Sequence, residues 1–264
     1  MIALDQVQPK ISIGISAIDL VSAIAAAHPR WRFTFVTFEV EPSSMEAIRP
    51  LINCEFLRHL NSLWEQLGSD TIRGLGGVIP RDRHWEVGWN SILAQSIDEG
   101  SFSPALDIVL KHETGRQATR GFEMKSEEIS SLSLTRIVES LPANYVLALC
   151  SVCRTPHNET LHLPLMDFRC APSPYFQPLV DLCLRRIGQR EGVIVRSGRS
   201  YHYYGLTACD GEAWRQFMCK CLLLAPLTDA RYIAHRLMEG LGVLRLSSAG
   251  SKPTTPIVEF RLSG

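Results

Sequence analysis

The chain of 264 residues lacks several features that would narrow its function at once. It has no net charge, because 27 Lys and Arg balance 27 Asp and Glu, so its overall composition does not favour a nucleic-acid-binding protein. It has no apolar run near the roughly 18 residues of a membrane helix, so we expect no membrane partner. No basic segment followed by a long apolar run opens the chain, so we expect no secretory signal and a cytoplasmic protein.

The chain also lacks the dense cysteines of a small disulfide scaffold. Its eight cysteines are scattered over a length that can bury a core without cross-links, so we expect reduced thiols. Cys150, Cys153, His157 and His162 have a spacing that suggests zinc. They span a predicted hairpin, however, on which the two cysteines face opposite sides of a straight strand. We therefore do not expect zinc as a cofactor.

The charges that are present are unevenly distributed. Residues 181–252 contain eleven Lys and Arg but six Asp and Glu, a surplus of five positive charges. A moderately basic region of this kind can face phosphates, and it can equally be an ordinary solvated surface.

Helix and strand patterns alternate clearly in the second half of the chain. Hairpins are predicted from three pairs of runs, 144–152 with 161–168, 192–197 with 200–206, and 242–248 with 256–262. Helices are predicted over 173–188, 210–224 and 229–242. This order predicts an α+β fold with a mixed or antiparallel sheet and helices packed on it.

The first half is harder to interpret. Helices are predicted over 15–28 and 43–68, and a strand over 31–40. A further helix over 125–142 would end at Pro142. We therefore expect an N-terminal α/β region of unknown role over 1–142 and a core over 143–264, or one continuous domain.

Three short patterns in the second half could carry chemistry. Asp167 ends an apolar strand, where a carboxylate suits Mg²⁺ or Mn²⁺ but can also simply form a turn. His202 follows Ser200 by two residues, so we expect both side chains on one face of a strand. Asp229 precedes a helix and is either its N-cap or a metal ligand.

The turn before His202 combines groups that favour an anion. It consists of Ser197, Gly198, Arg199 and Ser200, which offer hydroxyls, backbone N–H groups and a cation. His202 would add an imidazole, unless it is a half-buried histidine bonded to a backbone carbonyl. Arg245 lies in an otherwise apolar strand, as an exposed edge residue or as a phosphate contact.

Together these pieces resemble the motifs of the archaeo-eukaryotic primase superfamily. Asp167 stands where the first motif is expected, Ser200 and His202 match the S-x-H motif, and Asp229 stands at the third motif. The tail is similar to the bacterial branch called primase 1D-like, and the resemblance covers about residues 145–260.

The resemblance implies an RRM-like catalytic core with a primase-like site. Asp167 and Asp229 would hold Mg²⁺ or Mn²⁺ and act with His202 as catalytic residues. The turn from Ser197 to Ser200, with His202 and Arg245, would bind a nucleoside triphosphate. Single-stranded or template nucleic acid would be the second partner, and the reaction would make or extend primers.

One position departs from the family pattern. The second acid of the first motif is replaced by Arg169, which cannot ligate a metal ion. We therefore expect weak or single-site binding of Mg²⁺ or Mn²⁺ and less than full polymerase activity. Glu259 is an alternative third ligand.

Two other functions remain open. The chain could be a primase-like domain that has lost catalysis and binds nucleotide or nucleic acid. The resemblance implies that such a domain would act as a subunit in a mobile-element or defence system. It could also be an unrelated α+β interaction protein in which the motifs occur by coincidence.

Overall fold

The computed structural model describes residues 11–40 and 121–262, apart from residues 199, 226 and 251. The helix predicted over 43–68 and the residue Arg199 lie outside the described residues. The chain divides into two compact units, residues 1–40 with 118–264 and residues 41–117. The described residues therefore belong to the first unit.

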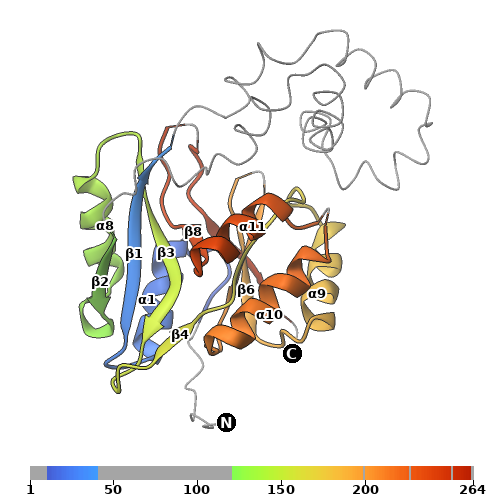
Figure 1. Cartoon of the computed structure of the whole chain (residues 1–264). Helices are drawn as coiled ribbons and strands as arrows, with labels where there is room; N and C mark the ends of the chain where they lie inside the picture. The colour runs from blue at the N-terminus through green and yellow to red at the C-terminus, as the bar shows by residue number, and fades with distance from the viewer. Residues whose placement is uncertain (1–10, 41–120, 199, 226, 251, 263–264) are drawn as a thin grey trace, which may run out of the picture. The chain divides into compact units, whose positions relative to one another are not determined.

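The first sheet is antiparallel and has five strands, with β2, β1, β3 and β4 side by side (Figure 1). β8 also pairs with β3, next to the segment that pairs with β4. The strands are β1 (Arg32–Glu39), β2 (Phe122–Lys125), β3 (Tyr145–Arg154), β4 (Thr160–His162) and β8 (Val243–Arg245).

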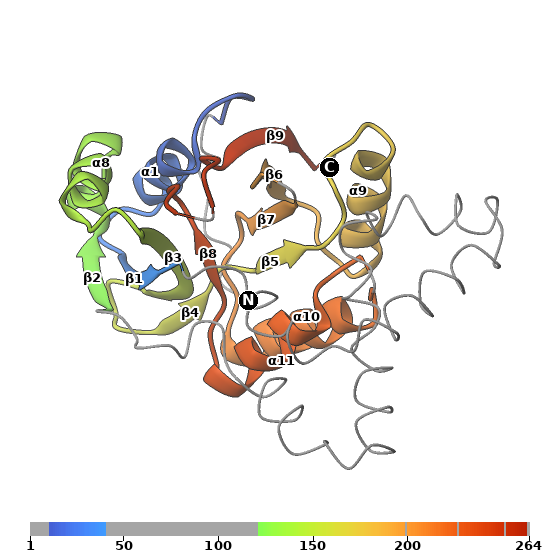
Figure 2. The same ribbon diagram turned by 90° about the horizontal axis from the view of Figure 1, so that it is seen from above.

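The second sheet is antiparallel and has four strands in the order β5-β7-β6-β9 (Figure 2). An isolated bridge between Phe168 and Thr228 continues this sheet beyond β5. The strands are β5 (Leu165–Phe168), β6 (Gly192–Arg196), β7 (Tyr201–Gly205) and β9 (Ile257–Arg261).

Five α-helices and one 3-10 helix accompany the sheets in the described residues. Asp210 caps α10, and Asp229 caps α11, which ends at Gly240 in the left-handed conformation (φ 73°). The helices are α1 (Ala17–Ala27), η3 (Ser126–Glu128), α8 (Ser131–Ser140), α9 (Phe176–Arg186), α10 (Gly211–Leu222) and α11 (Ala230–Glu239).

The second sheet follows a recognisable chain order. β5, α9, β6, β7, α10 and the bridged segment at Thr228 form a β-α-β-β-α-β succession, in which the last segment lies beside the first strand. The predicted α+β class, with antiparallel sheets and packed helices, is confirmed.

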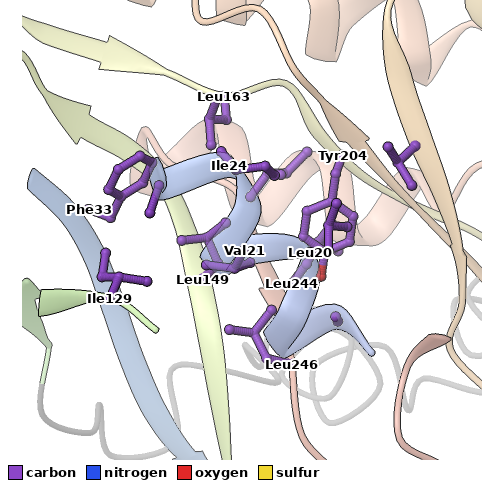
Figure 3. Packing of buried hydrophobic residues seen from close by; sticks show 14 of the residues in the cluster. Leu20, Val21, Ile24, Phe33, Ile129, Leu149, Leu163, Tyr204, Leu244 and Leu246 are labelled. Atoms are coloured by element: carbon purple, nitrogen blue, oxygen red, sulfur yellow. The ribbon is translucent and has the colours of Figure 1, made fainter. Parts of the chain in front are cut away.

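The main hydrophobic core joins α1 to both sheets (Figure 3). Leu20, Val21 and Ile24 of α1 are buried in the same cluster as Phe33 of the first sheet and Tyr204 of the second. Ser16 and Asp19 begin α1 with a capping box. The segment before the helix also pairs with β9, because the Gly14 N–H donates to the Val258 carbonyl at 2.9 Å.

The structure differs from the sequence-based expectation at two places. The run over 161–168 is divided at Pro164, so β4 stays with β3 while β5 joins the second sheet. The final hairpin was wrong, because β8 pairs with β3 and β9 with β6. β1 lies between β2 and β3, so residues 32–39 share a sheet with residues 122–125 and 145–154.

The described residues include no helix that is long and apolar enough to cross a membrane.

Candidate functional site

The site begins with two residues that face each other across β5 and β7. The antiparallel register places Asp167 opposite His202. Directly opposite residues of such a pair project from the same face of the sheet. The His202 Nε2 atom lies 3.7 Å from the Asp167 Oδ1 atom, and the Ser200 hydroxyl donates to that same oxygen at 3.3 Å. Ser200 and His202 were expected on one face of the strand, and both approach the Asp167 carboxylate there.

Asp229 reaches the same edge through the strand bridge beside β5. Phe168 pairs antiparallel with Thr228, and the Arg169 N–H donates to the Leu227 carbonyl at 2.7 Å. One further residue in this register sets Asp229 opposite Asp167. The Asp229 Oδ1 atom accepts from the N–H groups of Arg231 and Tyr232, at 2.9 and 3.1 Å. Asp229 is therefore the N-cap of α11, next to the residue that bridges to β5.

Arg169 pairs with one of the two carboxylates. It follows Asp167 by two residues, directly after β5 ends at Phe168. Its Nε atom lies 4.0 Å from the Asp229 Oδ2 atom, and the side chains of Arg169 and Asp229 are 21% and 30% exposed. A cation therefore faces the oxygen of Asp229 that does not cap the helix.

The turn from Ser197 to Ser200 is held from behind by Arg245. The Ser197 N–H donates to the Ser200 carbonyl at 2.8 Å, and Gly198 takes a φ of 80° that favours glycine. The Arg245 guanidinium donates to the carbonyls of Ser197, Ser247 and Thr254, at 2.9, 3.0 and 2.7 Å. Arg245 is buried rather than an exposed edge residue, and it ties the turn to the loop between β8 and β9.

His202 is a buried, neutral imidazole in a positive field. Burial lowers its pKa well below the usual value, and the charges of Arg245 and Lys252 lower the pKa further. The nearby Asp167 carboxylate would act in the opposite direction, but burial outweighs it. The His202 Nδ1 atom is buried and has no hydrogen-bond partner among the described residues. An unpaired buried ring nitrogen calls for an explanation, of which a bound water or ligand is one.

Lys252 is the residue that the sequence interpretation did not single out. It is exposed in the loop between β8 and β9, and its charge reaches His202, which lies fifty positions earlier in the chain. Its place in a short Gly- and Ser-containing loop was a weak signal by itself. Only the pairing of β9 with β6 brings this loop to the S-x-H turn.

The residues do not fit two divalent ions. The two-ion chemistry implied by the resemblance needs carboxylates that can bridge both ions. Here Oδ1 of Asp229 caps a helix, Oδ2 faces Arg169, and Arg169 occupies the place of the second acid. The described residues hold no group of three or more His, Cys, Asp or Glu arranged to bind a metal ion.

Glu259 cannot supply the missing ligand. Its carboxylate accepts from the Gln177 amide at 2.9 Å and the Tyr201 hydroxyl at 3.3 Å, and it pairs with Arg196. Tyr201 precedes His202 on β7, so the two side chains point to opposite faces of the sheet. Glu259 therefore lies on the face away from Asp167.

The cysteines and histidines that suggested zinc are also separated. Cys150 and Cys153 belong to different hydrophobic clusters. The His162 Nδ1 atom lies 3.1 Å from the Ser151 hydroxyl, and its ring stacks on Trp214. These contacts give His162 a structural role that joins β3, β4 and α10.

The fold and the site together define a class of protein. The β-α-β-β-α-β sheet, with an acid on its first strand, S-x-H at the start of its third and another acid after its second helix, is that of a primase-like protein of the archaeo-eukaryotic superfamily. A family model described as archaeo-eukaryotic primase 1D-like matches residues 125–257, slightly more than half of the chain. The chain belongs to this family. No curated protein and no solved structure shows a significant match.

Proposed function

We propose that this chain binds a nucleoside triphosphate through its phosphates, together with single-stranded or template nucleic acid, as a primase-like domain with reduced polymerase chemistry. The phosphate site consists of the turn from Ser197 to Ser200, His202 and Lys252. Arg245 stabilises the turn by donating a hydrogen bond to the Ser197 carbonyl.

The observation that carries the proposal is the environment of His202. A buried ring nitrogen without a hydrogen-bond partner is costly, and here it lies within the field of two cations. A phosphate oxygen would satisfy the imidazole and the cations at once, because it is anionic and accepts hydrogen bonds. The Ser200 hydroxyl, which donates to Asp167 on the same face, would be a further donor to the phosphate.

Arg245 contributes by position and by charge rather than by direct contact. Its three hydrogen bonds go to neutral carbonyls, so they do not neutralise the guanidinium. The carboxylate of Asp167 raises the pKa of Arg245 while burial, the larger effect, lowers it. We propose that the charge of Arg245, which is buried behind the turn, attracts the phosphates electrostatically.

We further propose that Mg²⁺ or Mn²⁺ binds weakly and at a single site, at Asp167 with support from Asp229. The donor sets of these two residues allow one ion more readily than two. Primer synthesis would then be slow, and binding of nucleotide or nucleic acid, as a subunit of a mobile-element or defence system, would be the principal activity.

Titration calorimetry with each of the four ribonucleoside triphosphates tests the proposal. His202→Ala should weaken binding by about 1.5–3 kcal/mol, or roughly 10- to 150-fold, the usual value of a hydrogen bond to a charged group. Binding should also weaken as salt rises, because the contacts are screened.

His157→Ala is the matched control, since His157 is an exposed histidine in the turn between β3 and β4. It should bind nucleotide like the natural chain. If the natural chain binds no triphosphate, or if both histidine variants bind equally well, the phosphate site is disproved.

A further inference from the structure

The position of Arg169 suggests how the site binds a triphosphate without the full set of metal-binding carboxylates. Arg169 follows Asp167 by two residues, directly after β5 ends, where a metal-binding site of this family would have a further carboxylate. It faces Asp229 with a separation of 4.0 Å, which is longer than a hydrogen bond. The pair is thus a long ion pair, and both side chains are largely shielded from solvent.

Cations accompany the carboxylates of the site in the part of the chain that the structure describes. Asp167 and Asp229 occur with Arg169, Arg245 and Lys252. His202 adds no charge at neutral pH because burial lowers its pKa. A site built to hold divalent ions would instead be negative before the ions bind.

A guanidinium can perform part of the task of a metal ion. It neutralises phosphate charge, and its planar donors match two phosphate oxygens at once. Arg169 cannot deprotonate, so this contribution is present at every physiological pH. An incoming phosphate would compete with Asp229 for the same guanidinium.

We propose that Arg169 takes the place of a divalent ion, so that the triphosphate binds to this chain without a metal. This inference rests on the proposed function and assigns Arg169 as a ligand-binding residue of the same site. Weak binding of one ion at Asp167 remains compatible with it, but the ion is not required for affinity.

The test compares nucleotide affinity with and without a divalent ion. ATP and inorganic triphosphate are titrated into the full chain, once in excess EDTA and once in Mg²⁺. The two affinities of the natural chain should agree within about threefold, whereas a site that needs the metal should lose at least about tenfold in EDTA. Inorganic triphosphate should compete with ATP, because the phosphates carry the contact.

Two substitutions then separate the charge of Arg169 from its size. Arg169→Gln should weaken binding in EDTA by roughly tenfold, the value of one charge-assisted contact. Arg169→Asp should abolish binding in EDTA and restore it in Mn²⁺, because it completes a three-carboxylate site. Arg186→Gln is the matched control, since Arg186 is exposed on α9 outside the site and loses the same charge.

The outcomes distinguish this inference from the proposed function. If the natural chain binds triphosphate only in Mg²⁺, the role of Arg169 is wrong and the phosphate site stands. The role is equally wrong if Arg169→Gln and Arg186→Gln weaken binding in EDTA to the same extent. If the natural chain binds no triphosphate in either condition, both proposals fail. Circular dichroism melting of each variant verifies that the fold is retained.

Discussion

At the scale of single residues, burial changes what a polar side chain can do. Arg245 was expected at an exposed edge or on a phosphate, but its buried guanidinium donates to three backbone carbonyls from two loops. His202 is held neutral by burial although a carboxylate is 3.7 Å away. Desolvation, which depends on neighbours far along the chain, leads Arg245 to donate to backbone carbonyls and keeps His202 neutral.

His28 allows the effect of burial to be measured away from the site. Burial lowers its pKa below 6.5, and its ring lies 4.4 Å from that of Trp31. The unfolded chain therefore binds more protons than the folded chain below about pH 6.5, so the stability contribution falls as the pH decreases. His28→Phe keeps a ring beside Trp31 and removes the titration. Its unfolding free energy should depend less steeply on pH between about 6.5 and 5.

Urea unfolding at several pH values measures this slope. The exposed variant His157→Gln serves as the control and should keep the slope of the natural chain. Equal slopes for His28→Phe and the natural chain would contradict the prediction.

At the scale of elements, a single residue that ends a strand can determine which sheet the following segment joins. The apolar run over 161–168 has a uniform strand pattern, yet Pro164 interrupts it. Proline has no N–H to donate to a ladder, while its carbonyl accepts from the Gly205 N–H at 2.8 Å. The chain therefore leaves the first sheet at this point and presents Asp167 on the second.

Asp229 connects the start of α11 to the site. Its Oδ1 atom accepts two backbone N–H groups of the first turn. Asp229→Ala should therefore lower the unfolding free energy by about 0.5–2 kcal/mol, the usual cost of losing an N-cap. Asp229→Asn keeps an acceptor at the same place and should cost much less.

Thermal or urea unfolding of the two variants provides the comparison. Asparagine and aspartate are similarly good caps, so a large difference between Asp229→Asn and the natural chain would show that the ion pair with Arg169, rather than the cap, stabilises this region.

At the scale of the whole molecule, segments from both ends of the described chain complete the two sheets. α1 contributes to the core between the sheets, and the segment before it pairs with β9. β1 lies between β2 and β3. Residues 125–257, which the family model matches, therefore share their hydrophobic core with α1 and β1, which lie outside the match.

A fragment of residues 121–264 should accordingly fail to fold. Without α1 and β1, it would expose buried residues such as Leu149 and Tyr204 and leave the β3 ladder unpaired on one side. The fragment 11–264 should unfold cooperatively in urea, as monitored by circular dichroism. Cooperative unfolding of the shorter fragment would show that the first forty residues are dispensable for the core.

The sequence alone determined the local features of this protein. Periodicity, caps and turn residues predicted the helices that end at Gly188 and begin at Asp210 and Asp229, and the hairpin around Ser197–Ser200. These features depend on neighbours a few positions apart, which the sequence displays directly. The order of acid, S-x-H and acid was also sufficient to suggest the superfamily, to which the family match assigns the chain.

Only the tertiary structure decided how these pieces meet. The run with Asp167 has the same apolar pattern as its neighbour, so sheet membership depended on Pro164 and on the partner strand β7, which follows α9 and β6 in the chain. Likewise, the sequence cannot show that Arg169 faces Asp229, that Arg245 clasps two loops, or that Lys252 lies near His202. Register between distant strands and the cost of burying charge are properties of the folded chain, and they turn a list of candidate residues into a single site.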